Sequence, residues 1–299
     1  MTFQINPNFN PPKRRPRHAG RETLQPHEAK SYAIGLLREH RVTPLADRVI
    51  DMLAVAGVLS ESQIKSLIPL SYRSLLRYYK LHLLDRVPTH GIKLTSYGFS
   101  KSERLYTLGV AGLVIAEMRR ESGLVPTSYL GYGVHRVIHD LLVNEVVIRL
   151  SCHAFVEQDI AVMWRSRYEA TVHDDDDRPV LEPDALLDFD GRQVVLEYHN
   201  EDTARRASEK VRRYERVHRG GHWRDSWQTN EFPWVLVAFT HRAVATGYQE
   251  AVQEAASMGL RCRYLGKPWV SFQRGDDPAL WQDFRTGKIV NVLTLKEGA

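Results

Sequence analysis

Cysteine is scarce in this sequence of 299 residues, which contains only Cys152 and Cys262. Two distant cysteines exclude a disulfide framework and a zinc site built on paired cysteines. Long apolar runs are also missing, because the longest, residues 108–118, is far below the roughly 20 residues that span a bilayer. Excess charge is small, with 41 Lys and Arg against 36 Asp and Glu. We therefore expect a cytoplasmic globular protein without membrane contact, whose affinity for any polyanion depends on where its charges lie.

The sequence also lacks the Gly-x-x-x-x-Gly-Lys-Ser/Thr loop that cradles phosphates, so no nucleotide cofactor is expected. Apolar residues are few at the start of the chain, where residues 1–30 combine Asn and Pro with a basic cluster at residues 13–17. This composition is typical of disorder. We expect residues 1–40 to form a basic flexible arm, which either follows DNA phosphates or is only a solvated tail.

Residues 41–125 have the element order of a winged helix domain. A helix capped by Thr43 is followed by a short second helix, which has a capping box at Ser60. Apolar residues at helical spacing predict a third helix over residues 71–87, with a basic outer face. Residues 88–109, which contain a glycine turn and a polar tip, predict a hairpin. Such a domain docks its third helix in the major groove of DNA, and its hairpin contacts phosphate or the minor groove.

The predicted DNA contacts form two groups. Side chains on the third helix would read the groove, and cations on the hairpin would fix the position on the backbone. The second group therefore affects affinity and salt dependence more than the choice of sequence. The candidates are Tyr72, Arg73, Arg77 and Lys80 on the helix, and Lys93, Lys101 and Arg104 on the hairpin.

Residues 126–268 alternate strands with helices, which indicates a mixed-sheet domain and an α+β or α/β fold class for the whole chain. Two strands over residues 184–200 flank an Asp190-Gly191 hairpin turn. The other predicted elements are helices at 133–150, 201–218 and 242–259, and strands at 233–240 and 261–266. Residues 269–299 form a C-terminal extension for which the sequence predicts no placement.

Two acidic residues carry the candidate chemistry. Asp184 begins the first strand of the hairpin and Glu197 lies near the end of the second, so pairing of the strands can bring the carboxylates together. Adjacent carboxylates repel each other, and a hard cation such as Mg²⁺ or Mn²⁺ relieves that repulsion. A water bound to such a metal supports the hydrolysis of a phosphodiester.

These residues resemble the signature of the PD-(D/E)xK nuclease superfamily, which is Pro-Asp, a hairpin, and then an acid, any residue and a lysine. The matching residues here are Pro183-Asp184 and Glu197-Tyr198-His199. The resemblance implies a restriction-endonuclease-like domain in which Asp184, Glu197 and the Tyr198 carbonyl hold the metal. It also implies a further acidic ligand on the preceding helix, for which Glu145 is the candidate.

The lysine of the signature is missing, because His199 stands in its place. A neutral His199 can ligate metal or act as a base, although a histidine at a strand end is also commonly a hydrogen-bonded structural residue. Lys210, at the edge of the buried stripe of the next helix, can point back toward the hairpin and replace the missing lysine. Alternatively, that helix is only a solvated, arginine-rich surface. The sequence thus leaves open a metal-dependent DNA nickase or endonuclease and a non-catalytic regulator or assembly factor.

The order of several motifs resembles the replication-relaxation family of plasmid and mobile-element proteins, over residues 43–240. The motifs are Leu-Tyr-x-Leu-Gly-x-x-Gly at 105–112, His-x-Leu-x-x-Asn-Glu at 139–145, Pro183-Asp184, Leu196-Glu197, and Lys210 with Tyr214. The resemblance implies DNA binding in plasmid replication, relaxation or transfer. The partners it implies are double-stranded DNA and other replication, transfer or transposition proteins, and the oligomeric state stays open.

Overall fold

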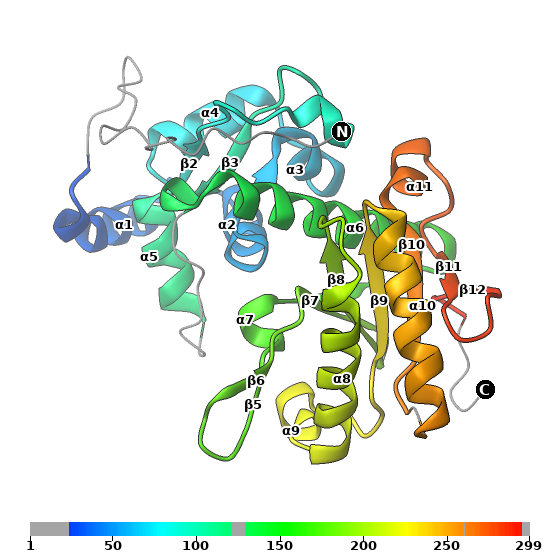
Figure 1. The fold of residues 1–299 in the computed structure, drawn as a ribbon. Coiled ribbons are helices and arrows are strands. Elements are labelled where there is room, and N and C mark those ends of the chain that lie inside the picture. Colours follow the sequence, from blue (N-terminus) through cyan, green and yellow to red (C-terminus); the bar gives the residue numbers. More distant parts are fainter. Residues whose placement is uncertain (1–23, 121–128, 260, 295–299) are drawn as a thin grey trace.

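The computed structural model describes residues 24–120, 129–259 and 261–294. They form a mixed α and β fold with a three-stranded sheet, a seven-stranded sheet and a two-stranded ribbon. Figure 1 shows the small sheet and its helices at one end of the molecule and the large sheet at the other, with α6 (Val134–Gln158) passing between them. Among the described residues, no helix is both long and apolar enough to cross a membrane.

The N-terminal elements pack around the three-stranded sheet, whose order is β1-β3-β2 with antiparallel pairs. Thr43 caps α2 by accepting a hydrogen bond from the Ala46 N–H at 3.2 Å, and Ser60 and Gln63 form the predicted capping box of α3. The elements are η1 (Pro26–Glu28), α1 (Ala29–Arg38), α2 (Pro44–Ala56), β1 (Leu59–Ser60), α3 (Glu61–Leu67), α4 (Tyr72–Lys80), β2 (Leu84–Val87), η2 (Leu94–Tyr97), β3 (Leu105–Leu108) and α5 (Val110–Arg119).

The flexible arm predicted for residues 1–40 is wrong for its last part. Residues 29–38 form α1, which packs on α5 and buries Ala29, Ala33 and Leu36. These three side chains are four and three residues apart, so they lie on one face of the helix. That apolar face holds α1 against α5. Residues 1–23, which contain the basic cluster, lie outside the described part of the chain.

The third helix is shorter than predicted. It ends at Lys80, and the left-handed φ of 56° at His82 marks the change of direction before β2. Leu84 fits the helical spacing, but in the structure it pairs with Leu108 of β3 and is buried in the small sheet. A hairpin of β2 and β3 is present, but β2 lies before the predicted range of residues 88–109, and a long loop over residues 88–104 that includes η2 replaces the predicted first strand.

The glycines of the 105–112 motif let α5 begin against the chain that leads into β2. A Cβ atom at Gly112 would lie 2.1 Å from the Leu83 carbonyl oxygen, and one at Gly109 would lie 2.4 Å from that of His82. We expect Gly112→Ala to lower the free energy of unfolding by about 1–3 kcal/mol, because backbone must shift to admit the methyl group.

Gly35→Ala in α1 is the matched control for that substitution. A Cβ atom at Gly35 would have no neighbour within 4 Å. The change should therefore be neutral or stabilise by up to about 1 kcal/mol, as alanine does in helices. Urea denaturation measures both variants, and an equal effect of the two would contradict the close approach at Gly112.

The seven-stranded sheet has the order β12-β11-β10-β9-β8-β7-β4, with β8, β9 and β10 parallel and the other pairs antiparallel. Leu196 on β8 lies in the core shared with α6, and Val195 lies in the core shared with α8 and α10. Figure 1 shows α8 and α10 side by side on their face of the sheet. The predicted Asp190-Gly191 turn joins β7 and β8, with both residues at positive φ.

The elements of this half begin with η3 and end at the sheet edge. They are η3 (Tyr129–Gly131), α6, β4 (Val162–Ser166), α7 (Arg167–Ala170), β5 (Val172–His173), β6 (Pro179–Leu181), β7 (Ala185–Phe189), β8 (Arg192–His199), α8 (Arg205–Gly220), α9 (Trp223–Trp227), β9 (Trp234–Phe239), α10 (Arg242–Ser257), β10 (Tyr264–Pro268), α11 (Trp269–Arg274), β11 (Leu280–Asp283) and β12 (Ile289–Asn291). Residues 269–294 are therefore no separate extension, because α11 buries Trp269 and Phe272 and the last two strands continue the sheet.

The helix α6 joins the two halves of the molecule. Asn144 Nδ2 donates hydrogen bonds to the carbonyl oxygens of Ala56 at 3.0 Å and Val58 at 2.6 Å, at the end of α2. The opposite side of α6 packs on the large sheet. The domain boundary predicted near residue 125 falls within residues 121–128, outside the described ranges.

Candidate functional site

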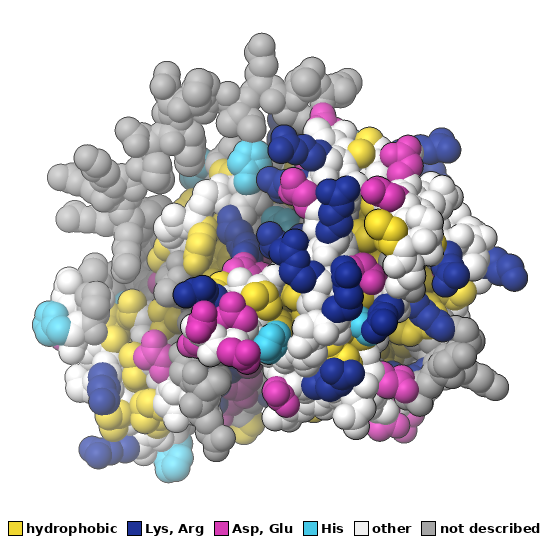
Figure 2. All heavy atoms as spheres, turned by 60° about the horizontal axis from the view of Figure 1, so that its bottom comes forward, with side chains coloured by type: hydrophobic (Ala, Val, Ile, Leu, Met, Phe, Trp, Pro, Cys, Tyr) yellow, Lys and Arg dark blue, Asp and Glu magenta, His cyan; other side chains and the backbone are white. Residues whose placement is uncertain are grey.

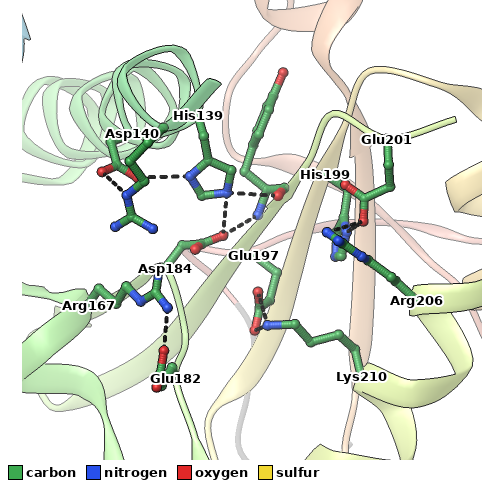
Figure 3. A network of polar contacts seen from close by, with 12 residues as sticks. His139, Asp140, Arg167, Glu182, Asp184, Glu197, His199, Glu201, Arg206 and Lys210 are labelled. Atoms are coloured by element: carbon green, nitrogen blue, oxygen red, sulfur yellow. Dashed lines mark hydrogen bonds and ion pairs between the residues drawn. The ribbon is translucent and has the colours of Figure 1, made fainter. Parts of the chain in front are cut away.

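Asp184 lies directly before β7. Its backbone N–H donates to the Leu196 carbonyl at 3.0 Å, and its Oδ2 accepts a hydrogen bond from the Tyr198 N–H at 2.8 Å. These bonds continue the pairing of β7 and β8 past Ala185. They hold the carboxylate against the end of β8, next to Glu197 (Figure 3). The hairpin therefore brings the two acidic side chains together.

Glu197 is 1% exposed and accepts hydrogen bonds from α8. Lys210 Nζ donates to both carboxylate oxygens at 2.7 Å, and Tyr214 Oη donates to Oε1 at 2.7 Å. Lys210 and Tyr214 are four residues apart, so one helix face supplies both donors. A carboxylate buried this deeply is tolerated only with such partners. Lys210 points back to the hairpin, as one of the two interpretations of the sequence proposed.

His139 on α6 approaches the same pair of strands. Its Nε2 lies 3.3 Å from Asp184 Oδ2 and 3.2 Å from the Tyr198 carbonyl oxygen. Its Nδ1 lies 2.9 Å from Asp140 Oδ1. Both ring nitrogens thus face oxygen acceptors, and a ring that donates from both nitrogens is the protonated imidazolium.

Charge determines the protonation of this site. Burial acts to lower the pKa of His139, but the carboxylates of Asp184 and Asp140 outweigh it and raise that pKa to about 10. Burial acts to raise the pKa of Asp184, but His139, Lys210 and the Tyr198 N–H hold it well below its ordinary value. The acid pair is thus matched by two cationic side chains, one on each of the helices α6 and α8.

His199, predicted to be catalytic, contacts side chains other than those of Asp184 and Glu197. Its side chain is buried, with Nε2 2.8 Å from Tyr248 Oη and Nδ1 2.7 Å from Glu201 Oε1. Burial acts to raise the pKa of Glu201, but the hydrogen bond with His199 outweighs it and lowers that pKa to about 2. His199 therefore occupies the lysine position of the signature without facing the acid pair.

Glu145, predicted to be the third metal ligand, lies at the interface with α3. It accepts hydrogen bonds from Arg149 Nε at 2.7 Å and from Gln63 Nε2 at 2.9 Å. The side chain that α6 directs to the acid pair is His139. Among the described residues, no group of three or more His, Cys, Asp or Glu side chains is arranged to hold a metal ion.

Sequence reasoning assigned no role at the site to His139 or Tyr214. Both belong to motifs that were visible: His139 opens the 139–145 motif, and Tyr214 follows Lys210 at helical spacing. The missing information was the rotation of each helix about its axis, because that rotation decides which motif residue faces the hairpin.

Of the residues predicted to contact DNA, some have exposed side chains and others contact neighbouring side chains of the protein. Exposed side chains are those of Arg73, Arg77 and Lys80 on α4, and those of Lys93 and Lys101 in the 88–104 loop. Arg104 is engaged: its guanidinium lies 4.4 Å from the ring centroid of Tyr72 and it pairs with Glu61 at 3.0 Å. The Tyr72 hydroxyl also accepts a hydrogen bond from Arg86 at 3.1 Å.

Fold and site together define a mixed α and β protein with an acid pair on a β-hairpin, joined to a small helix-rich unit with exposed cations. The chain belongs to the replication-relaxation family, whose model matches residues 50–232. The match covers most of the small unit, α6, the hairpin and α8. Membership indicates a role in the replication or relaxation of a plasmid or mobile element. No curated protein and no solved structure matches the chain.

Proposed function

We propose that this chain is a cytoplasmic protein that binds duplex DNA in the replication, relaxation or transfer of a plasmid or mobile element. The observation that carries this proposal is the set of exposed cations on α4, in a unit with the element order α2, β1, α3, α4, β2, β3 of a winged helix. In that fold the helix equivalent to α4 enters the major groove. Other replication, transfer or transposition proteins are the further partners that we propose.

Tyr72 supports this assignment by joining α4 to the small sheet. Its ring contacts Arg104, just before β3, and its hydroxyl binds Arg86 of β2. These contacts fix the first turn of α4 relative to the strands that carry the 88–104 loop. We therefore assign Tyr72 and Arg104 to positioning, and we assign direct DNA contact to Arg73, Arg77, Lys80, Lys93 and Lys101.

Binding of a labelled duplex, followed by fluorescence anisotropy at low and moderate salt, tests the proposal. Each phosphate contact releases counterions, so about four contacts lower the affinity roughly 100-fold between 50 and 200 mM salt. An unlabelled supercoiled plasmid is a suitable competitor for the labelled duplex. Absence of duplex binding at low salt would overturn the proposal.

We further propose that the second half has the layout of a PD-(D/E)xK domain but acts without metal-dependent cleavage. The Asp184 and Glu197 carboxylates and the Tyr198 carbonyl are oxygen donors of the kind that Mg²⁺ or Mn²⁺ accepts. However, His139 Nε2 already contacts Asp184 and the Tyr198 carbonyl, and Lys210 Nζ contacts both oxygens of Glu197. A divalent ion could reach these oxygens only by displacing His139 or Lys210, and the cation that stayed would repel it. The residues as arranged therefore do not fit a metal.

The internal cations suggest a structural role for this site. His139 fixes α6, and Lys210 fixes α8, to the same end of the β7–β8 hairpin. Asn144 ties the same helix α6 to the end of α2 in the DNA-binding unit. We infer a non-catalytic regulator or assembly factor, in which the nuclease-like half is a rigid platform for the DNA-binding half.

A further inference from the structure

Arginines cover the outer face of α8, which neither the acid pair nor the DNA-binding unit uses. At about 100° per residue these side chains lie on the face opposite the buried residues Val211 and Tyr214. Figure 2 shows Lys and Arg side chains gathered in a band across this part of the molecule. Of the two acids in α8, Glu215 is buried and Glu209 is exposed. The exposed cations of this α8 face are Arg205, Arg206, Arg212, Arg213, Arg216 and Arg219.

The positive charge of the α8 face is only weakly neutralised. Its ion pairs are Arg205–Glu209 at 3.7 Å, Arg206–Glu201 at 3.8 Å and Arg212–Glu254 at 3.6 Å. Long, solvent-exposed pairs of this kind contribute little and are readily exchanged for another anion. Arg216 has no ion-pair partner within residues 24–120, 129–259 and 261–294. The face is therefore available to a polyanion.

The chemistry of the α8 face fits the backbone of duplex DNA. Arginine binds phosphate through two parallel hydrogen bonds, which a lysine cannot form. The arginines span about 21 Å of helix, along which a duplex presents about a dozen phosphates. Trp223 and Trp227, in the following helix α9, are buried and so cannot stack on unpaired bases. A duplex is thus a better occupant than a single strand.

We propose that the α8 face binds the phosphate backbone of a second segment of duplex DNA. Figure 1 places α4 and α8 at opposite ends of the molecule, with α6 and the large sheet between them. A segment seated on α4 is therefore separate from one seated on α8. This inference goes beyond the proposed function, because it gives one chain two DNA-binding surfaces and the capacity to bridge two duplexes.

A bridging assay tests the inference with the full-length protein. Beads carry one short duplex, protein is added, and retention of a second, fluorescent duplex is measured. The wild-type protein is expected to retain it. Arg212→Ala, Arg213→Ala, Arg216→Ala together should still bind the beads but lose most of the retention. In solution, binding of the second duplex has a slope of log affinity against log salt concentration. The same variant should reduce the size of that slope by roughly three, about one for each phosphate contact.

The matched control removes three exposed cations that belong to neither proposed DNA surface, at Lys30 in α1 and at Arg285 and Lys288 between β11 and β12. It has the same change in net charge and should bridge as the wild type does. Replacing the three α8 arginines with lysine should restore part of the retention. The inference is overturned if the α8 variant bridges normally, or if the control loses as much retention. Failure of the proposed function is a different result: Arg73→Ala, Arg77→Ala, added to the α8 variant, would then leave duplex binding unchanged.

Discussion

Replacing Lys210 with methionine is expected to lower the free energy of unfolding by about 3–5 kcal/mol, the usual effect of removing one partner of a buried ion pair. Methionine keeps most of the apolar stem of the side chain but removes the ammonium group. Glu197, which is 1% exposed, would then retain only the Tyr214 hydroxyl as a side-chain donor among its described partners. Urea denaturation followed by circular dichroism measures the change.

Two further variants show whether the loss comes from the buried charge. Adding Glu197→Gln to Lys210→Met removes the unpaired carboxylate and should recover a large part of the stability. Lys65→Met removes a cation from a pair with Glu61 on the surface of α3 and should cost less than about 1 kcal/mol. If Lys210→Met lowers the free energy of unfolding no more than Lys65→Met does, the ammonium group of Lys210 does not compensate the buried charge of Glu197.

Arg73→Ala together with Arg77→Ala is expected to weaken duplex binding by at least roughly 30-fold, because each arginine contact to a base is worth about 1–3 kcal/mol. Both side chains are exposed on α4, one helical turn apart, so they can enter one groove together. Stability should not change, because neither side chain is buried. Fluorescence anisotropy at fixed salt gives the affinity, measured in the Arg212→Ala, Arg213→Ala, Arg216→Ala background so that the α8 face does not contribute.

The matched control for this pair is Arg285→Ala with Lys288→Ala, which removes the same charge between β11 and β12, at the far edge of the large sheet. It should weaken binding only slightly, through net charge. A competitor series with altered duplex sequences adds a second measure, because loss of groove contacts should also reduce discrimination between them. Equal losses for the two pairs would mean that α4 does not read the groove.

Local signals in the sequence sufficed to predict many elements. The Thr43 cap and the Ser60 capping box mark where α2 and α3 begin, and the Asp190-Gly191 turn marks the β7–β8 hairpin. In each case the stabilising contacts are between residues close in sequence. The pairing of Asp184 with β8 follows from the same hairpin.

Features that depend on distant contacts were harder to predict. Leu84 has a spacing that suits a helix, and only its pairing with β3 makes it a strand residue. The short strands β11 and β12 have too few residues for a periodic pattern, and β10 provides the edge on which they form. Tertiary packing decides such cases.

The choice between His139 and Glu145 has the same origin. They are six residues apart on α6 and therefore point about 120° apart around the helix axis. An interpretation based on metal ligands favours Glu145 because it is acidic. In the structure, packing of α6 on the large sheet instead turns His139 toward Asp184 and Glu145 toward Gln63. The sequence predicts the helix, and its rotation depends on the whole core.

We propose that this protein binds DNA without cutting it at the acid pair. Supercoiled plasmid incubated with the protein in Mg²⁺, Mn²⁺ or EDTA tests it, beside an Asp184→Asn, Glu197→Gln variant that is purified identically. We predict that the wild-type protein retards the plasmid on a gel and leaves it supercoiled under all three conditions. Nicked circles that form only with the divalent ions, and that disappear in the variant, would contradict the claim.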